Sequence, residues 1–138
     1  MKLTTRGEYG VLAMHDLAMH YGTGPVALKV IAARQGISEH YLEQLMRPLR
    51  QDGLVRSVRG AQGGYELARA PAEISVGDIL RVVEGPLSTL ECVADGASCK
   101  RSAKCAARSV WELLDRKIND VLDSTTLHHL CTGTVGQE

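Results

Sequence analysis

The sequence has no phenylalanine, one tryptophan and four tyrosines, so aromatic residues make up only 4% of the chain. Aliphatic side chains must therefore supply most of the core, and a hydrophobic fraction of 44% is sufficient to build one. No apolar run is long enough to span a bilayer. The first residues, MKLTTRGEYG, lack the apolar stretch and cleavage site of a secretory signal. We therefore expect a cytoplasmic protein without a membrane segment.

Net charge is also absent, because sixteen Lys and Arg balance sixteen Asp and Glu. The balance differs along the chain: residues 1–69 carry nine basic against six acidic side chains, and residues 70–138 carry seven against ten. A mildly basic first half is compatible with a polyanionic partner. The enzyme motifs G-x-S-x-G, P-loop and H-E-x-x-H do not occur. These features favour a binding protein over an enzyme.

Hydrophobic periodicity predicts three helices in the first third of the chain, at about 5–21, 28–35 and 38–52. Thr5 and Glu8 have the spacing of a capping box, and Ser38 is a good N-cap. Pro48 should kink or shorten the third helix because it removes a backbone donor. Two short strands, 54–58 and 65–67, then surround a glycine-rich turn. Three helices and a hairpin predict a winged helix-turn-helix, whose third helix suits the major groove of DNA.

The second half of the chain is expected to contain a helix ending at residue 83 or 84, a cysteine-bearing loop and a long helix at about 102–123. At 1.5 Å per residue that helix would be roughly 30 Å long, about the width of the domain before it. Its apolar stripe should be covered partly by a second chain, so we predict a homodimer that presents two recognition helices to a two-fold symmetric DNA site. The stripe consists of Val110, Leu113, Leu114, Ile118, Val121 and Leu122.

The predicted fold is mostly α-helical and has three parts. Residues 1–84 form the winged helix-turn-helix DNA-binding domain, residues 85–106 form the cysteine loop, and residues 107–138 form the dimerisation helix and a C-terminal tail. Candidate DNA contacts lie on the third helix, where Gln and Arg can read base edges, and on the wing, where Arg suits the minor groove. A solvated helix face beside an ordinary hairpin fits the same periodicity. The candidates are Ser38, His40, Tyr41, Glu43, Gln44, Arg47, Arg56, Arg59 and Gly60.

Three cysteines, Cys92, Cys99 and Cys105, lie within fourteen residues, with gaps of six and five residues between them. Zinc sites usually contain closer cysteine pairs, whereas an iron–sulfur cluster tolerates wider spacing. A redox-active trio is a third use, because neighbouring Lys and Arg side chains lower thiol pKa values. Three buried cysteines without chemistry would be unusual in a loop. These residue types leave zinc, a cluster and a thiol switch open.

The sequence resembles the IscR-type winged-helix regulators of bacteria, which include IscR, NsrR and CymR. The resemblance is carried by LTTRGEYG, SEHYLEQLMRPLRQDGLVRSVRGAQGGY, GDILRVVEGP, the cysteine loop with Trp111, and VLDSTTLHHL, and it covers nearly the entire chain. It implies a dimer joined by the long helix, which sets the cysteine loop of one subunit near the DNA-binding domain of the other. It assigns DNA reading to Ser38, Tyr41, Glu43, Gln44, Ser57, Arg59 and Gly60.

The same resemblance implies an iron–sulfur cluster held by Cys92, Cys99 and Cys105, with 2Fe–2S favoured and 4Fe–4S as the alternative. Its occupancy would modulate promoter recognition, and cluster-assembly genes are the expected targets for repression. IscR-type proteins place a histidine ligand where this chain has Arg108, and a guanidinium cation is a poor metal ligand. The fourth ligand must therefore come from elsewhere. The candidates are Glu8 and Glu43, ranked level, with His15 and Cys131 weaker.

A second interpretation follows from YLEQLMRPLR, RSVRGAQGGY and LDSTTL, which resemble CymR. It predicts a repressor of cysteine and sulfur metabolism, controlled by cysteine synthase as a protein partner or by thiol redox state. CymR has no such cysteine loop, so the three cysteines favour the cluster regulator.

Overall fold

The computed structural model describes residues 3–87 and 106–137. In chain order its elements are α1 (Thr5–Met19), α2 (Leu28–Gln35), α3 (Glu39–Gln51), β1 (Val55–Val58), β2 (Gly64–Leu67), the 3-10 helix η1 (Pro71–Glu73), α4 (Val76–Glu84), α6 (Arg108–Ser124) and α7 (Leu127–Thr132). The fold is mostly helical, and a two-stranded sheet follows the third helix. This order confirms the predicted winged helix-turn-helix.

The turn between α2 and α3 is set by Gly36, whose φ of 69° lies in the left-handed region that glycine adopts at little cost. Ser38 then caps α3, because its side-chain oxygen accepts a hydrogen bond of 3.0 Å from the backbone N–H of Tyr41. The helix continues through Pro48 to Gln51, so the proline does not shorten it by a turn. Burial of Leu45 and Leu49 holds this last turn against the core.

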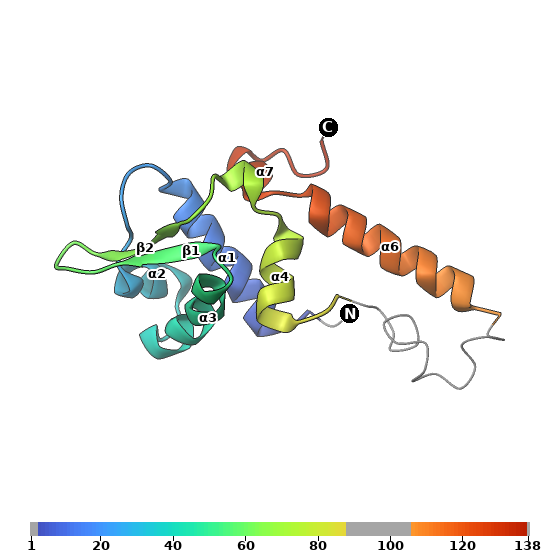
Figure 1. Ribbon diagram of the computed structural model, residues 1–138, viewed down its shortest axis with the longest axis horizontal. Coiled ribbons are helices and arrows are strands. Elements are labelled where there is room, and N and C mark those ends of the chain that lie inside the picture. Colours follow the sequence, from blue (N-terminus) through green and yellow to red (C-terminus); the bar gives the residue numbers. More distant parts are fainter. Residues whose placement is uncertain (1–2, 88–105, 138) are drawn as a thin grey trace.

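The wing is an antiparallel hairpin in which Val55 pairs with Leu67 and Val58 pairs with Gly64. Val26, which precedes α2, exchanges two backbone hydrogen bonds of 2.8 Å with Tyr65 and ties the hairpin to the helices. A side chain at position 64 would collide with the Val26 carbonyl, so this close approach requires glycine. Figure 1 shows the hairpin projecting from one end of the molecule, beside α2 and α3.

The start of α1 differs from the predicted Thr5–Glu8 capping box. The N-cap is Thr4, and its side chain caps no backbone group of the helix. Instead, the Thr4 N–H donates a 2.9 Å hydrogen bond to the carboxylate of Glu84, at the end of α4. Glu84, eighty positions along the chain, therefore takes the part that Glu8 was predicted to play in the cap. Gly7 leaves room for the Glu84 carboxylate, which a side chain at position 7 would meet. The helix also ends at Met19, two residues before the predicted end, and Tyr21 beyond it is half exposed.

The core is aliphatic and lies where α1 contacts α4, α7 and the wing. The short α7 helix closes it, because Leu127 is fully buried and the Thr126 side chain caps the helix. Helix α7, near the end of the described chain, therefore packs against the domain that α1 to α4 form. The fully buried large side chains are Met14, Leu17, Ile31, Leu42, Leu45, Met46, Leu49, Leu54, Leu67, Ile74, Ile79 and Leu127.

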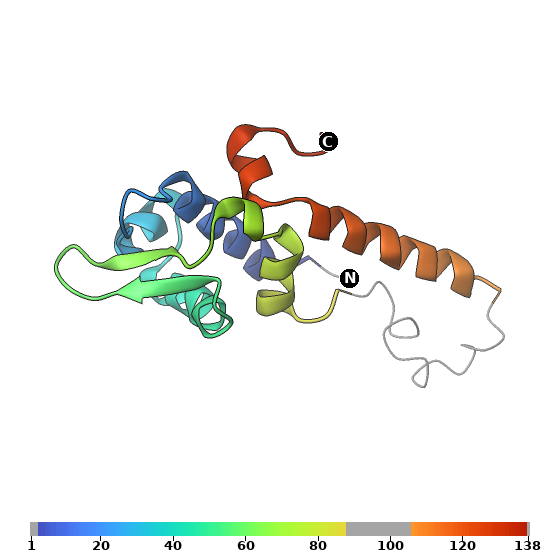
Figure 2. The same ribbon diagram turned by 45° about the horizontal axis from the view of Figure 1, so that its top comes forward.

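Helix α6 extends away from this core, at the end of the molecule opposite the wing (Figures 1 and 2). Residues 102–105 of the predicted helix lie outside the described residues, and the described helix begins at Arg108. None of its residues is buried. Arg81 of α4 anchors its C-terminal end through hydrogen bonds of 2.5 Å to Asp123 and 2.7 Å to Asn119. The hydrogen bond to Asp123 raises the pKa of Arg81.

Candidate nucleic-acid interface and cysteine-site ligands

The outer face of α3 is polar and exposed. Its side chains are those of His40, Glu43, Gln44 and Arg47, and the opposite face of the helix is buried in the core. The amide of Gln44 lies 3.2 Å from a ring nitrogen of His40, which orders the two side chains one turn apart. Ser38 uses an acceptor lone pair of its hydroxyl oxygen in the helix cap, which fixes where α3 begins, and its exposed O–H can still donate a hydrogen bond. The face presents donors and acceptors that suit base edges.

Tyr41 lies between this face and the core. Its side chain is half buried, and its ring meets the ring of Tyr9 edge-on, with centroids 6.2 Å apart and an interplanar angle of 86°. The pair packs α3 against α1. Tyr41 therefore positions the recognition helix as well as bordering its outer face.

The wing presents Arg56, Ser57, Arg59 and Gly60 to solvent. Arg56 and Glu66 face each other in the strand register, and their side chains form an ion pair of 2.9 Å. Sequence periodicity did not reveal this partner, which reduces the charge that Arg56 offers to a phosphate. Within residues 3–87 and 106–137, no acidic side chain pairs with Arg59. Arg59 is therefore the freer cation of the wing.

Cys92, Cys99 and Cys105 lie outside the described residues. The candidates for a fourth ligand are placed: Glu8 is exposed on the first turn of α1, and Glu43 is exposed on α3. His15 is half buried on α1, about two turns beyond Glu8. In the described part of the chain, no three His, Cys, Asp or Glu side chains are grouped so that they could hold a metal ion.

Two further residues bear on the metal ligands. Arg108, at the position of the histidine in IscR-type proteins, forms an ion pair of 2.7 Å with Glu112 one turn along α6. A guanidinium held in such an ion pair is a poor metal ligand. Cys131 lies on α7, half buried, and this burial raises the pKa of its thiol. Because the thiolate is the form that binds a metal, burial makes Cys131 a poorer ligand.

An apolar groove of about 400 Å³ runs between the start of α1, α4 and the end of α6. Glu8 borders it, and Leu3 and Leu12 are about half exposed beside it. The sequence pattern did not show this groove, because it is assembled from three separate helices. Its lining residues are Leu3, Gly7, Glu8, Val11, Leu12, Val76, Leu80 and Leu122.

An exposed recognition helix beside an arginine-bearing wing defines a winged-helix DNA-binding protein of the transcriptional-regulator class. The chain matches the family model of Rrf2, an iron-dependent transcriptional regulator, over residues 3–133. It belongs to the Rrf2 family of transcriptional regulators. The relatives and the fold are those of regulators, not enzymes. Among the described residues, we find no helix that combines the length and the apolar character needed to cross a membrane.

Two named members of the family are similar over nearly the whole chain. The regulator CymR from Bacillus subtilis (strain 168) is 46% identical over 138 residues, which are 100% of this chain and 95% of CymR. The solved structure of CymR, described as the global cysteine regulator of B. subtilis, has a TM-score of 0.84 and covers 97% of this chain and 98% of its own. T. potens IscR is 52% identical, with a TM-score of 0.78, covering 96% of this chain and 88% of its own.

Proposed function

We propose that this chain is an iron–sulfur-dependent regulator that binds a two-fold symmetric DNA site as a homodimer and represses cluster-assembly genes. The observation that carries the proposal is the combination of Cys92, Cys99 and Cys105 with a winged helix whose reading face is exposed. The proposal divides the chain into a DNA-binding domain (1–84), a cluster-binding loop (85–106) and a dimerisation helix with its tail (107–138).

The donor set suits an iron–sulfur cluster. Thiolates are its usual protein ligands, and Cys92, Cys99 and Cys105 would provide three of the four ligands. The cluster would be 2Fe–2S, with 4Fe–4S as the alternative. When bound, it supplies a redox-sensitive centre whose presence depends on iron and oxidants. The protein residues would hold it and connect its presence to the position of the DNA-binding surfaces.

Exposed apolar surface on α6 supports the dimer. Val110 and Val121 are 56% and 62% exposed, and Leu113 and Leu114 lie between them on the same stripe. Helix α6 contacts its own domain through Asn119 and Asp123, which lie on a different side of the helix. The stripe therefore remains open for a second copy. The apolar groove beside Glu8 offers a seat for part of the partner's helix.

This arrangement favours Glu8 over Glu43 as the fourth ligand. The cysteine loop directly precedes α6, so a partner helix seated in the groove would carry its cysteines toward the groove margin, where Glu8 lies. Glu43 lies on the DNA-reading face, where a ligand role would compete with base contacts. His15 is half buried on α1, and burial raises the pKa of the Cys131 thiol, so both remain weaker candidates.

The test is to compare Cys99→Ala, Glu8→Gln and Glu43→Gln after anaerobic purification. We expect Cys99→Ala to lose iron, sulfide and the visible absorption of the cluster, and its affinity for promoter DNA to change. Glu8→Gln should lose the cluster more readily in air, whereas Glu43→Gln should keep it and change base preference. Unaltered DNA binding in Cys99→Ala, and in the corresponding alanine variants of Cys92 and Cys105, would contradict a cluster-controlled switch, though not DNA binding itself.

A second function is favoured by the 46% identity to CymR over the whole chain. Under this alternative, the protein represses genes of cysteine and sulfur metabolism, and cysteine synthase or the redox state of the thiols controls it. A co-purification with cysteine synthase, with and without sulfur metabolites, distinguishes this alternative from the cluster-dependent regulator. A stable complex that changes DNA affinity supports the alternative, and the absence of any complex under either condition rejects its protein-partner form.

A further inference from the structure

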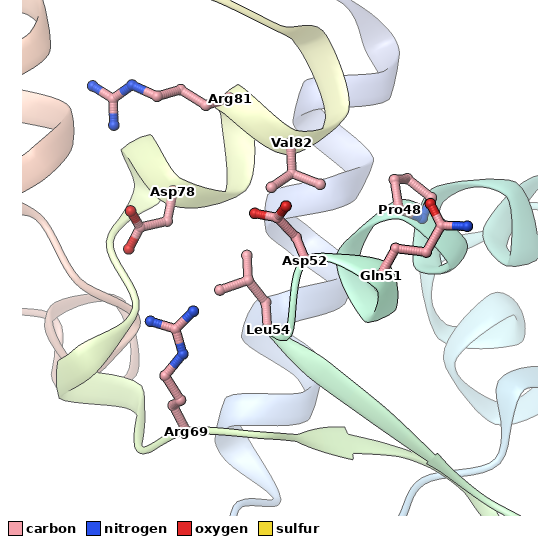
Figure 3. A pocket seen from close by; sticks show the side chains of 8 residues that line it. All are labelled: Pro48, Gln51, Asp52, Leu54, Arg69, Asp78, Arg81 and Val82. Atoms are coloured by element: carbon pink, nitrogen blue, oxygen red, sulfur yellow. The ribbon is translucent and has the colours of Figure 1, made fainter.

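A cavity of about 410 Å³ lies between the end of α3, Leu54 just before β1, Arg69 shortly after β2, and α4. It lies on the opposite side of α4's first turns from the Glu8 groove, with which it shares no lining residue. Its volume is in the range of small-molecule sites. Leu54, Val82 and Pro48 supply apolar contact surface, and four charged side chains also line it (Figure 3): Asp52, Arg69, Asp78 and Arg81.

Two of these four charges are already occupied. Asp78 accepts a 3.0 Å hydrogen bond from the backbone N–H of Ser75 in the capping box of α4. Arg81 donates to Asp123 and Asn119 of α6, and Figure 3 shows its guanidinium directed away from the cavity. These two residues therefore form a fixed wall of the cavity.

The other two charges have opposite sign and no protein partner. Within residues 3–87 and 106–137, no ion pair or side-chain hydrogen bond joins Arg69 or Asp52 to another residue. Figure 3 shows the Asp52 carboxylate between Val82 and Leu54, and the Arg69 guanidinium rising toward the same space from below. The two side chains come from different elements, one at the end of α3 and one after β2. They face one cavity without meeting.

We propose that this cavity is a binding site for a small zwitterion of the amino-acid class. Its carboxylate would be bound by Arg69, whose planar guanidinium matches a carboxylate in two parallel hydrogen bonds. Its ammonium group would lie against Asp52, with Asp78 as a second acidic neighbour. Its apolar part would contact Leu54 and Val82. A ligand with only one of the two charges would leave Arg69 or Asp52 without a partner.

The position of the cavity gives such a ligand a consequence. Asp52 ends the recognition helix, and Asp78 and Arg81 belong to α4, which is tied to α6. A bound zwitterion would therefore link the recognition helix to the helix that holds α6. We expect this link to change the affinity of the protein for its promoter DNA. That effect rests on the proposed function, whereas binding of the zwitterion does not.

The test is a saturation-transfer NMR screen of the twenty common L-amino acids against the full chain, followed by calorimetry of the best binder. Arg69→Gln and Asp52→Asn remove one charge each. Arg50→Gln is the matched control, because Arg50 is exposed near the end of α3, two residues before Asp52, and does not line the cavity. We expect each of the two cavity variants to weaken binding about tenfold or more, equivalent to about 1.4 kcal/mol, and the control to bind within about twofold of the wild type.

Two analogues of the best binder, one without the amino group and one without the carboxylate, should each bind about tenfold more weakly than the parent. The proposal is overturned if no amino acid binds with a Kd below about 10 mM, a limit corresponding to about −2.7 kcal/mol. It is also overturned if binding survives in both cavity variants, or if either analogue binds as well as the parent. Promoter affinity measured with and without the amino acid then tests the effector role alone, and an unchanged affinity would reject that role.

Discussion

At the scale of single residues, Arg56 and Arg59 lie on one hairpin but differ in what surrounds their charges. Glu66 pairs with Arg56, and Arg59 is exposed without an acidic partner in the described part of the chain. We expect Arg59→Ala to weaken promoter binding by about 1–3 kcal/mol if Arg59 contacts bases, and to reduce the salt slope by about one if it contacts phosphate. Fluorescence anisotropy across a salt series measures both quantities.

Arg116→Ala is the control, because Arg116 is an exposed arginine on α6, at the other end of the molecule. It should retain the affinity and the salt slope of the wild type. If Arg59→Ala behaves in the same way, the wing does not contact DNA through this residue.

Ser38 has a structural role that is separable from DNA reading. Because its side-chain oxygen accepts the N–H of Tyr41, Ser38→Ala removes the cap of α3 and should lower the free energy of unfolding by about 1 kcal/mol. Urea denaturation followed by circular dichroism gives this value. Ser57→Ala, at an exposed strand position, should change the stability by less than about 0.5 kcal/mol. Equal stabilities for both variants would show that the cap contributes nothing.

Cys131 offers a test of burial through pH. Because burial disfavours its thiolate, its pKa is raised, and at a given pH a smaller fraction of this thiol is ionised than in a free cysteine. In a variant with Cys92, Cys99 and Cys105 replaced by Ser, alkylation by iodoacetamide should rise with pH around a midpoint above that of a free cysteine. The alkylation rate of the urea-unfolded variant provides the reference. A midpoint at or below the reference would contradict the packing of α7 against the core.

Sequence patterns predicted local residue roles better than distant ones. The cap of α3 by Ser38 was predicted, because donor and acceptor lie three residues apart. The cap of α1 was predicted wrongly, since its acceptor is Glu84, which only the folded chain brings to Thr4. The Arg56–Glu66 ion pair was not predicted for a similar reason, because it depends on the register of the hairpin.

At the scale of elements, α6 is the part of the structure that most needs a partner. Its stripe leaves Leu114 44% exposed, and burial of that remaining surface would stabilise an interface by about 1 kcal/mol on each chain. Leu114→Asp should therefore raise the dimer dissociation constant by about 100-fold or more, because it would bury a charge on both chains. Analytical ultracentrifugation over a concentration series measures this constant.

Arg116→Asp is the matched control for this helix. Position 116 lies about 200° around the helix from position 114, and its side chain is exposed, so the same aspartate should leave the dimer intact. Dissociation by Arg116→Asp as strong as that by Leu114→Asp would show that the apolar stripe is not the interface.

Helix existence was predictable from periodicity, whereas helix ends and tertiary positions were not. The 28–35 helix was predicted with the observed bounds, and its end is marked by Gly36. The periodic stripe of α6 was also predicted, and its exposure in the described chain agrees with the expected need for cover. The return of α7 to the core through Leu127 was not predicted, since a six-residue helix carries too little periodicity to indicate a buried face.

At the scale of the whole molecule, the wing and α6 lie at opposite ends, with α1 and α4 between them (Figure 1). Helix α4 contacts both α1 and α6, and its Glu84 caps α1 next to the groove where Glu8 lies. Helix α4 also contacts α3, so packed helices connect the groove beside Glu8 to the recognition helix. The sequence showed the DNA face and the cysteines. The groove and the charged cavity could not be predicted, because each is lined by residues from several separate elements.

The most direct test of the proposed function is the iron and acid-labile sulfide content of the anaerobically purified full chain, with zinc measured in the same sample. The proposal predicts iron and sulfide in equal amounts, about two of each per chain for 2Fe–2S, or about four for the alternative cluster. Both elements should fall close to zero in Cys99→Ala. Zinc alone, or no metal after anaerobic reconstitution with iron and sulfide, would contradict a cluster-dependent regulator and leave control by a protein partner or by the thiols.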